Sequence, residues 1–159
     1  MNQPNYNKKL LKRKWQEKFF KLVKNRYRFI GLCGPNSKGY LKLINKLKFQ
    51  TILLYDKDVS NLKLVPRQNN LIRFNEDINN HLDRNAFYDL DYCCNISTIK
   101  KYLPKIMSIK EFTITLALRS ISEEKTLDIL CKYKRNFLYR VYVEKGCPMM
   151  ILYFPLKIK

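Results

Sequence analysis

Short apolar runs alternate along the chain with segments of helical periodicity, and most runs end in turn-forming or acidic residues. The continuous apolar or β-branched runs predict five buried strands, at Tyr27–Cys33, Thr51–Tyr55, Leu71–Phe74, Ala86–Leu90 and Glu111–Leu118. Two more strand-like runs, Leu138–Glu144 and Met149–Lys157, flank a Lys-Gly-Cys-Pro turn and predict a hairpin. The pattern therefore predicts five strand-and-connection units followed by two antiparallel strands.

The segment Lys8–Arg28 has the periodicity of an amphipathic helix. Its apolar residues recur at spacings of four, four, three and one, at Leu11, Trp15, Phe19, Leu22 and Val23. Lys and Arg dominate the other faces. The pattern predicts a first helix that docks its apolar stripe on the core and turns its charges outward.

Three later segments predict connecting helices. One spans Lys38–Lys48 after a Gly-Pro-Asn-Ser turn in which Asn36 or Ser37 is the candidate N-cap. A second, Ser97–Met107, contains a helix-weakening proline. A third begins at a Ser-Ile-Ser-Glu capping box and reaches about Phe137.

Alternating strands and helices predict an α/β fold with a mostly parallel sheet and right-handed crossovers, and the final hairpin adds antiparallel pairing. A length of 159 residues suits one domain with a substantial core. We therefore divide the chain into a basic amphipathic N-terminal helix, residues 1–26, and an α/β domain, residues 27–159. No apolar stretch is long enough to span a bilayer.

The net charge of +19, from 32 Lys and Arg against 13 Asp and Glu, is typical of a protein with a polyanionic partner. The first 50 residues carry 14 of the basic residues and one acidic residue. The candidate nucleic-acid-binding residues are therefore Lys8, Lys9, Lys12, Arg13, Lys14, Lys18, Lys21, Lys24, Arg26 and Arg28. Three alternatives stay open for this helix: a merely solvated charged face, an anionic membrane surface, and a partner subunit.

Five cysteines, an odd number without a C-x-x-C pair, and the single His81 leave no zinc site of recognisable spacing and predict no metal. They indicate reduced thiols and therefore an intracellular, reducing compartment such as cytoplasm or nucleoid, with a viral, plasmid or organellar origin open. Cys93 and Cys94 are better interpreted as packing residues than as nucleophiles, because no base lies near them in the sequence.

Glycine, asparagine and acidic residues mark the ends of the first four predicted strands. They are Gly31, Gly34 and Asn36 at the first, Asp56 at the second, Asp77 at the third, and Asp89, Asp91 and Tyr92 at the fourth. Together with the order of elements, these strand ends resemble the class I S-adenosylmethionine (SAM)-dependent methyltransferases over Tyr27–Lys157. Open α/β sheets bind their ligands beyond the carboxyl ends of the strands.

The resemblance implies a three-layer sandwich around a seven-stranded sheet, with SAM as cofactor. It implies a glycine-rich turn, with Gly31, Gly34 and Gly39, whose backbone approaches the methionine part of SAM, and it makes Gly31, Gly34 and Asn36 candidate cofactor-binding residues. Asp56 would then bind the ribose hydroxyls and Asp77 the adenine. Asp89, Asp91 and Tyr92 would form the catalytic, target-binding end of the fourth strand, where Asp91 accepts a hydrogen bond or a proton and Tyr92 stacks on a base.

The sequence departs from the family pattern at two places. Phe29 stands where the acid before the glycine turn is expected, and the fourth strand end reads Asp-Leu-Asp-Tyr-Cys-Cys without the family's Pro-Pro or Pro-Cys. The leading hypothesis is a SAM-dependent methyltransferase acting on RNA or DNA. The alternative is a catalytically inactive, methyltransferase-like subunit that binds nucleic acid or scaffolds a nucleoprotein complex.

Two further interpretations concern the acids alone. Asp56, Asp58 and Asp77 would, without any ligand, simply end strands and cap the next helices. Asp89 and Asp91 also form the D-x-D pair of a magnesium-dependent phosphotransferase or nuclease. The position of this pair, beyond the middle of the chain, disfavours that interpretation.

Overall fold

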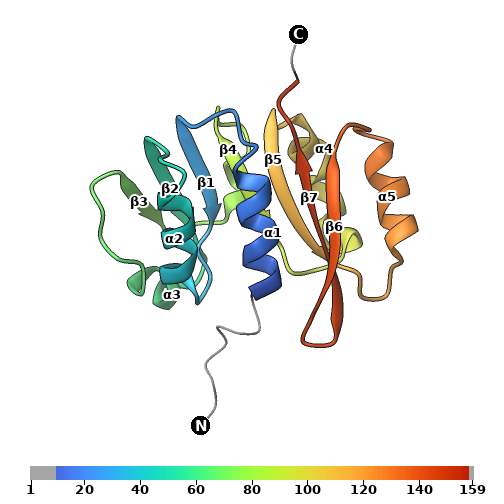
Figure 1. Ribbon diagram of the computed structural model, residues 1–159, viewed down its shortest axis with the longest axis horizontal. Coiled ribbons are helices and arrows are strands. Elements are labelled where there is room, and N and C mark those ends of the chain that lie inside the picture. Colours follow the sequence, from blue (N-terminus) through green and yellow to red (C-terminus); the bar gives the residue numbers. More distant parts are fainter. Residues whose placement is uncertain (1–9, 158–159) are drawn as a thin grey trace.

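A single seven-stranded sheet of order β3-β2-β1-β4-β5-β7-β6 forms the centre of the computed structural model, which describes residues 10–157 (Figure 1). The strands are β1 (Arg28–Leu32), β2 (Thr51–Tyr55), β3 (Leu71–Phe74), β4 (Phe87–Asp91), β5 (Glu111–Ala117), β6 (Leu138–Glu144) and β7 (Cys147–Phe154). The first five pair in parallel, and β7 is antiparallel to both β5 and β6. The predicted mostly parallel sheet with a terminal hairpin is confirmed.

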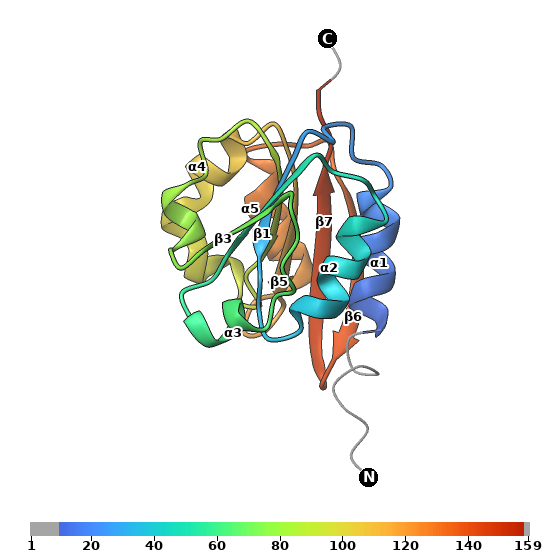
Figure 2. The same ribbon diagram turned by 90° about the vertical axis from the view of Figure 1, so that its left-hand side faces the viewer.

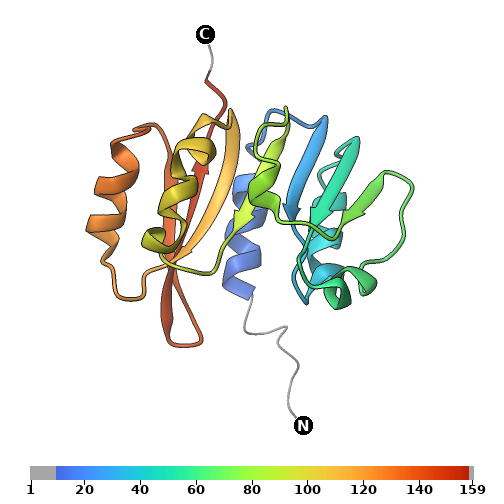
Figure 3. The same ribbon diagram turned by 180° about the vertical axis from the view of Figure 1, so that it is seen from behind.

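Helices cover both faces of the sheet, which makes the fold a three-layer sandwich. The helices are α1 (Leu10–Phe20), α2 (Ser37–Asn45), α3 (Val59–Lys63), α4 (Leu103–Ser108) and α5 (Glu123–Cys131), with 3-10 helices η2 (Ile78–Asn80) and η3 (Ile96–Tyr102). The helices α1 and α2 lie on one face, and η3, α4 and α5 lie on the other (Figures 2 and 3). In residues 10–157, no helix has the length and apolar character that a membrane crossing requires.

The side chains of β4 alternate between the hydrophobic cores on the two faces of the sheet. Phe87 packs edge-to-face with Phe20 of α1, at a ring-centroid distance of 5.6 Å, in the core beneath α1 and α2. Tyr88 and Leu90 point into the opposite core. Since side chains of a strand alternate between its faces, Asp89 and Asp91 share the face of Phe87 and lie on the α1 side.

The four predicted helices all differ from their expected bounds, and α2 ends at Asn45 instead of Lys48. α1 ends at Phe20, where the Arg26 guanidinium donates to the carbonyl oxygens of Phe20 and Lys21 at 3.3 Å and so satisfies groups at the helix end. The segment expected as one helix over Ser97–Met107 is a 3-10 helix followed by α4. Its proline lies in the first turn of α4, where the missing N–H costs no hydrogen bond.

The last predicted helix also stops early. α5 begins after Ser122, whose hydroxyl accepts the Lys125 N–H at 3.1 Å, as the capping box predicts. It ends at Cys131 instead of continuing to about Phe137. Phe137 instead stacks against Phe154 at a centroid distance of 5.1 Å, which draws the chain back to the sheet before β6.

Candidate functional site

The carboxyl ends of the five parallel strands all lie at the same end of the sheet, and the start of α1 and the turn between β6 and β7 lie there too (Figure 1). Chain order reverses between the adjacent strands β1 and β4, which is the topological switch point of the sheet. Ligands of open α/β sheets bind at such a point. All the strand-end residues predicted from the sequence therefore lie at or near the carboxyl end of the sheet, where folds of this kind bind their ligands.

Asp56 connects the turn after β1 to the turn after β2. One of its carboxylate oxygens accepts the Gly34 N–H and the Asn61 amide, both at 3.0 Å. The other oxygen accepts the Asp58 N–H at 2.8 Å. Gly34 has φ of +65°, which favours glycine, and a Cβ added to it would meet no atom within 4 Å. The turn after β1 is thus held in place by Asp56 and open to solvent.

Gly31 has a different role from the one that the resemblance implies. It lies inside β1, and a Cβ added to it would be 2.5 Å from the Tyr40 hydroxyl and 2.8 Å from the Phe29 ring. The glycine therefore makes room for Tyr40, a side chain of α2. Asn36 precedes α2 but makes no side-chain cap, while its carbonyl accepts the Tyr40 N–H at 3.3 Å.

Asp77 caps the short helix η2 at the end of β3. Its carboxylate accepts the Asn79 N–H at 2.9 Å and pairs with the Lys57 ammonium at 3.1 Å. Partial burial raises the pKa of Asp77, but this hydrogen bond and Lys57 together hold the pKa below its usual value. Asp58 likewise caps α3 by accepting the Ser60 N–H at 2.9 Å. The capping interpretation is therefore confirmed for both residues.

Asp89 is completely buried in the middle of the sheet. Its carboxylate accepts hydrogen bonds from the Tyr40 hydroxyl, from the Thr113 hydroxyl at 2.7 Å and from the Gln16 amide at 3.3 Å. Burial and the charge of Asp91 raise the pKa of Asp89 to about 6, although the hydrogen bonds oppose this rise. All the donors come from this chain, so Asp89 is a structural centre between the sheet, α1 and α2.

Asp91, two residues further along β4, forms an ion pair with the Lys12 ammonium of α1. The Cys93 thiol donates to the other carboxylate oxygen at 2.9 Å. Burial alone would raise the pKa of Asp91, but Lys12 lowers it below the usual value. The same pairing raises the pKa of Lys12 against the opposing effect of burial. Asp91 is therefore a paired carboxylate and a weak base.

Tyr92 turns to the other side of the strand end from Asp91. It packs against the core beneath α4 and η3, and its hydroxyl donates to the Asn79 side chain at 2.6 Å. Burial raises the pKa of this phenol above its usual value. The structure thus separates Tyr92 from the two acids with which the sequence grouped it.

The buried face of α1 differs from the predicted apolar stripe. Leu11 and Leu22 are 46% and 45% exposed, whereas Lys12 and Gln16 are 3% and 0% exposed. The reason lies in β4, because the carboxylates of Asp89 and Asp91 need donors where the stripe would otherwise pack. Phe19, Phe20 and Val23 complete the buried face.

This arrangement corrects one predicted phosphate contact. Lys12 is buried and paired, so it is not available to a polyanion. Lys8 and Lys9 lie outside the described residues. Arg13 lies over the Tyr40 ring and Arg26 caps α1, so both are partly engaged. The candidates with exposed side chains are Lys14, Lys18, Lys21 and Lys24, while Arg28 is half-buried in β1.

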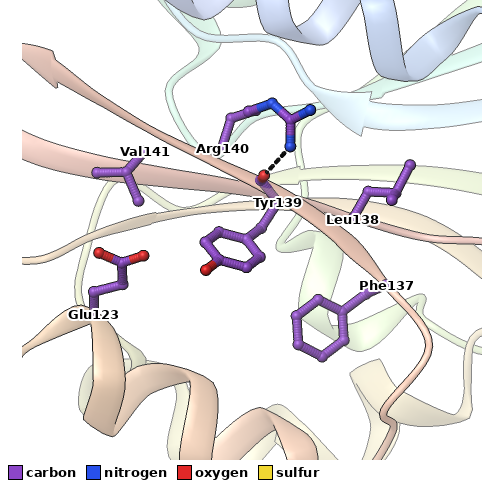
Figure 4. A pocket seen from close by; sticks show the side chains of 6 residues that line it. All are labelled: Glu123, Phe137, Leu138, Tyr139, Arg140 and Val141. Atoms are coloured by element: carbon purple, nitrogen blue, oxygen red, sulfur yellow. Dashed lines mark hydrogen bonds between the residues drawn. The ribbon is translucent and has the colours of Figure 1, made fainter.

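Two cavities flank the hairpin at the β6 side of the sheet. The larger, of about 420 Å³, lies between the edge strand β6 and the start of α5, with Phe137 and Tyr139 turned toward α5 (Figure 4). It contains none of the predicted site residues. The smaller, of about 240 Å³, lies at the carboxyl ends of β4 and β5 and is lined by Lys12, Cys93, Ala117, Arg119, Glu144, Lys145, Cys147 and Met149. The smaller cavity is the better candidate for a target site, because two partners of Asp91 form part of its wall.

Two hydroxyls near the smaller cavity have no hydrogen-bond partner. They belong to Thr115 of β5 and Tyr142 of β6, and both are buried. In register, Thr115 is opposite Asp91, and Tyr142 is opposite Met149 of the cavity wall. In the described part of the chain, no group of three or more His, Cys, Asp or Glu side chains is arranged to hold a metal ion.

Solved structures share this fold, although no protein-family profile and no curated protein matches the sequence. A putative RNA methyltransferase from Pyrococcus horikoshii superposes with a TM-score of 0.67 at 8% identity, over 99% of this chain and 87% of that one. Human methyltransferase-like protein 13, in complex with S-adenosylhomocysteine (SAH), gives a TM-score of 0.66 at 16% identity, over 92% and 82% of the two chains. M. capricolum TrmK, also with SAH, gives 0.62 at 11% identity, over 89% and 70%.

The protein therefore has the class I, Rossmann-like fold of SAM-dependent methyltransferases, as the resemblance implied. The superpositions extend through most of the chain and include the N-terminal helix in the P. horikoshii case, where 99% of this chain is covered.

The sequence did not indicate several residues that hold the strand ends together. Gln16, Tyr40 and Thr113 all contact Asp89, but each lies far from it in the chain or in a segment predicted for packing. One signal was available: acids at alternate positions of an otherwise apolar strand indicate two buried carboxylates on one face. Such carboxylates require donors from a covering helix.

Proposed function

We propose that the protein is a SAM-dependent methyltransferase that acts on nucleic acid, RNA or DNA. The observation that carries the proposal is the Asp56 carboxylate bound to the Gly34 N–H at 3.0 Å, at the switch point of a methyltransferase fold. Two of the similar structures, methyltransferase-like protein 13 and TrmK, contain SAH, and the P. horikoshii protein is named a putative RNA methyltransferase. This supports SAM as the cofactor.

The residues at the strand ends fit the adenosine half of SAM. Asp56 and Asp77 are partly accessible acids at the ends of β2 and β3, and each keeps capacity to accept a further hydrogen bond. The open turn at Gly34 leaves space beside them, and the buried Ser37 hydroxyl at the start of α2 has no partner. We infer that Asp56 binds ribose hydroxyls and that Asp77 lies nearest the base.

The smaller cavity is the proposed target site. SAM, when bound, supplies a methyl group already activated on its sulfonium, so the protein needs chiefly to orient the acceptor. Arg119 and Lys145 also line this cavity and favour an acceptor that carries phosphate. Since Lys12 holds Asp91 ionised, Asp91 serves as a hydrogen-bond acceptor for an amino or hydroxyl target rather than as a strong general base.

Calorimetric titration with SAH tests the proposed cofactor site. We expect micromolar binding by the wild type and at least tenfold weaker binding by Asp56→Ala. Asp128→Ala is the matched control, because it removes an exposed acid from α5 on the opposite face of the sheet. Asp56→Asn keeps one acceptor oxygen for the Gly34 N–H. It therefore distinguishes loss of the contact with SAH from loss of the hydrogen bond that holds the turn after β1. A folded wild type that gives no heat at millimolar SAH contradicts the proposal.

A second candidate function is a non-catalytic subunit that binds nucleic acid or scaffolds a nucleoprotein complex. The observation that favours it is that Asp89, Asp91 and Tyr92 all have partners from within the chain. Transfer of labelled methyl groups from SAM to total RNA or DNA distinguishes the two functions. SAH binding without transfer, at any pH between 6 and 9, favours the non-catalytic subunit; transfer that Asp91→Asn suppresses favours the enzyme.

A further inference from the structure

The outer surface of α1 and α2 is a continuous basic face. Its exposed lysines are Lys14, Lys18 and Lys21 on or directly after α1 and Lys38, Lys42 and Lys46 on or directly after α2. The two helices lie side by side and both run away from the carboxyl edge of the sheet (Figures 1 and 2). Because the lysines recur every three or four residues, each row repeats at roughly 5 to 6 Å.

Very little negative charge offsets these two rows. Glu17 is the only acidic residue between positions 10 and 48, and it lies between the rows. Its carboxylate is 3.8 Å from the Lys21 ammonium and 3.9 Å from the Lys46 ammonium. One carboxylate shared by two lysines leaves the face with a large net positive charge. Mutual repulsion of the lysines is relieved when a polyanion binds.

The basic face extends past α1 onto the edge strand β6. The half-buried Trp15 indole lies beside three cations: the Lys18 ammonium at 4.8 Å, the Arg140 guanidinium at 5.4 Å and the Lys14 ammonium at 5.5 Å from the ring centre. Cation–π attraction gathers these groups around one aromatic ring. The face is therefore wider than one helix and spans α2, α1 and the middle of β6.

We propose that this face of α1, α2 and Arg140 binds the phosphate backbone of nucleic acid. The inference rests on the proposed function in one respect, the nucleic-acid partner, and adds the surface that holds it. α2 was not among the segments for which the sequence predicted this role, and Lys12 is excluded from it. Two rows of point charges with a single carboxylate, Glu17, between them recognise phosphate by charge, so binding is independent of base sequence.

The packing of α1 disfavours an anionic membrane as the partner. A helix that lies in a lipid interface inserts its apolar face among the acyl chains. Here Phe19, Phe20 and Val23 are buried against the sheet, and among residues 11–24 only Leu11 and Leu22 are exposed as large apolar residues. The exposed surface is thus charged without an apolar stripe to insert.

Salt-dependent binding of labelled oligonucleotides tests the proposal. Anisotropy titrations of the SAM-free, full-length protein are made with a single-stranded and a duplex oligonucleotide over a range of KCl concentrations. The test variant is Lys18→Gln/Lys42→Gln, one exposed lysine from each row. The matched control is Lys125→Gln/Lys132→Gln, which removes the same charge from in and beside α5, on the opposite face of the sheet.

We expect the slope of log affinity against log salt to fall by about 1.5 in the test variant, since two phosphate contacts are lost. The control should keep the wild-type slope. Equal slopes in all three proteins, or an equal loss in the control, overturn the proposal. The proposal is also overturned if the protein binds neither oligonucleotide but binds vesicles that contain phosphatidylserine, and if this vesicle binding is weaker in the test variant.

SAH calorimetry on the same preparations keeps the two proposals distinguishable. The lysines of the basic face lie away from Asp56 and Asp77, so SAH binding should be unchanged in the test variant. Oligonucleotide binding without SAH binding leaves the basic face established and rejects the methyltransferase. SAH binding by a protein that binds neither oligonucleotide rejects the basic face alone.

Discussion

Lys12 of α1 and Asp91 of β4 form an ion pair across 79 residues of chain, and the Lys12 side chain is only 3% exposed. Replacing Lys12 by Met keeps the length of the side chain but leaves a buried carboxylate without its cation. We expect Lys12→Met to lower the free energy of unfolding by about 3 to 5 kcal/mol. Urea denaturation at pH 7 measures this loss.

A double-variant cycle tests the cause of that loss. Asp91→Asn added to Lys12→Met removes the unpaired charge, so the double variant should be more stable than Lys12→Met alone. Lys14→Met, at an exposed position of the same helix, should stay within about 0.5 kcal/mol of the wild type. A Lys12→Met protein as stable as Lys14→Met would mean that the ion pair contributes nothing.

Asp89 gives the protein a pH dependence of unusual sign. Burial raises its pKa to about 6 in the folded protein, against about 3.8 in the unfolded chain. Between these values the folded state binds more protons, so stability falls as the pH rises from about 4 to about 6. The loss from this group is about 3 kcal/mol and is complete above its folded pKa.

The variant Asp89→Asn isolates that contribution. It cannot ionise, so the difference in unfolding free energy between it and the wild type should change steadily between pH 4 and pH 6 and be flat from pH 7 to pH 8. Urea denaturation in a pH series supplies the comparison. A constant difference across the whole range would show that Asp89 does not titrate there.

Glu111 fastens the connection between α1 and β1 to the sheet. Its buried carboxylate accepts the Lys24 and Asn25 N–H groups at 2.8 and 2.9 Å and the Tyr153 hydroxyl at 2.6 Å. Glu111→Ala leaves the Lys24 and Asn25 N–H groups unpaired, while the Tyr153 hydroxyl keeps the Leu22 carbonyl as acceptor at 3.1 Å, and the change should cost about 3 kcal/mol or more. Tyr153→Phe leaves both N–H groups paired with Glu111 and removes only the hydroxyl's contacts with Glu111 and Leu22, so it should cost about 1 kcal/mol. Thermal unfolding measures both losses, and equal losses of stability in the two variants would contradict the expected difference.

Gly31 and Gly39 should respond to alanine in opposite directions. At Gly31 the new methyl group would lie 2.5 Å from the Tyr40 hydroxyl, whereas at Gly39, inside α2, it would meet nothing within 4 Å. We expect Gly31→Ala to destabilise the protein by about 1 to 3 kcal/mol. Gly39→Ala should stabilise it by about 0.5 to 1 kcal/mol. A denaturant midpoint below that of the wild type for Gly31→Ala, and above it for Gly39→Ala, would confirm both expectations.

The sequence predicted the strands well because their signals are local. Thr51–Tyr55 and Leu71–Phe74 are observed with the predicted bounds, and Ser122 caps α5 as its motif indicates. Each of these depends on residues within a few positions of one another. The antiparallel pairing of β6 with β7 likewise follows from the short turn between them.

The buried face of α1 could not be predicted in the same way. Its apolar spacing pointed to Leu11 and Leu22, yet Lys12 and Gln16 are the residues that turn inward. Their partners are on β4, more than 70 residues away, so the periodicity of the helix segment does not reveal them. The free-energy cost of burying a carboxylate without a donor is larger than the cost of leaving two leucine side chains in water. The sequence therefore placed its candidate residues at the strand ends, where the structure has them, but it did not indicate the partners of the acids.

The dependence of α1 on β4 also sets an order of events during synthesis. Gln16 is made 73 residues before Asp89, the group against which it docks. At about 5 to 20 residues per second, this interval is roughly 4 to 15 s. During those seconds α1 is complete while Gln16 lacks Asp89, Lys12 lacks Asp91 and the Phe20 ring lacks Phe87, so the side of α1 that later faces β4 is open to a chaperone or a neighbouring chain.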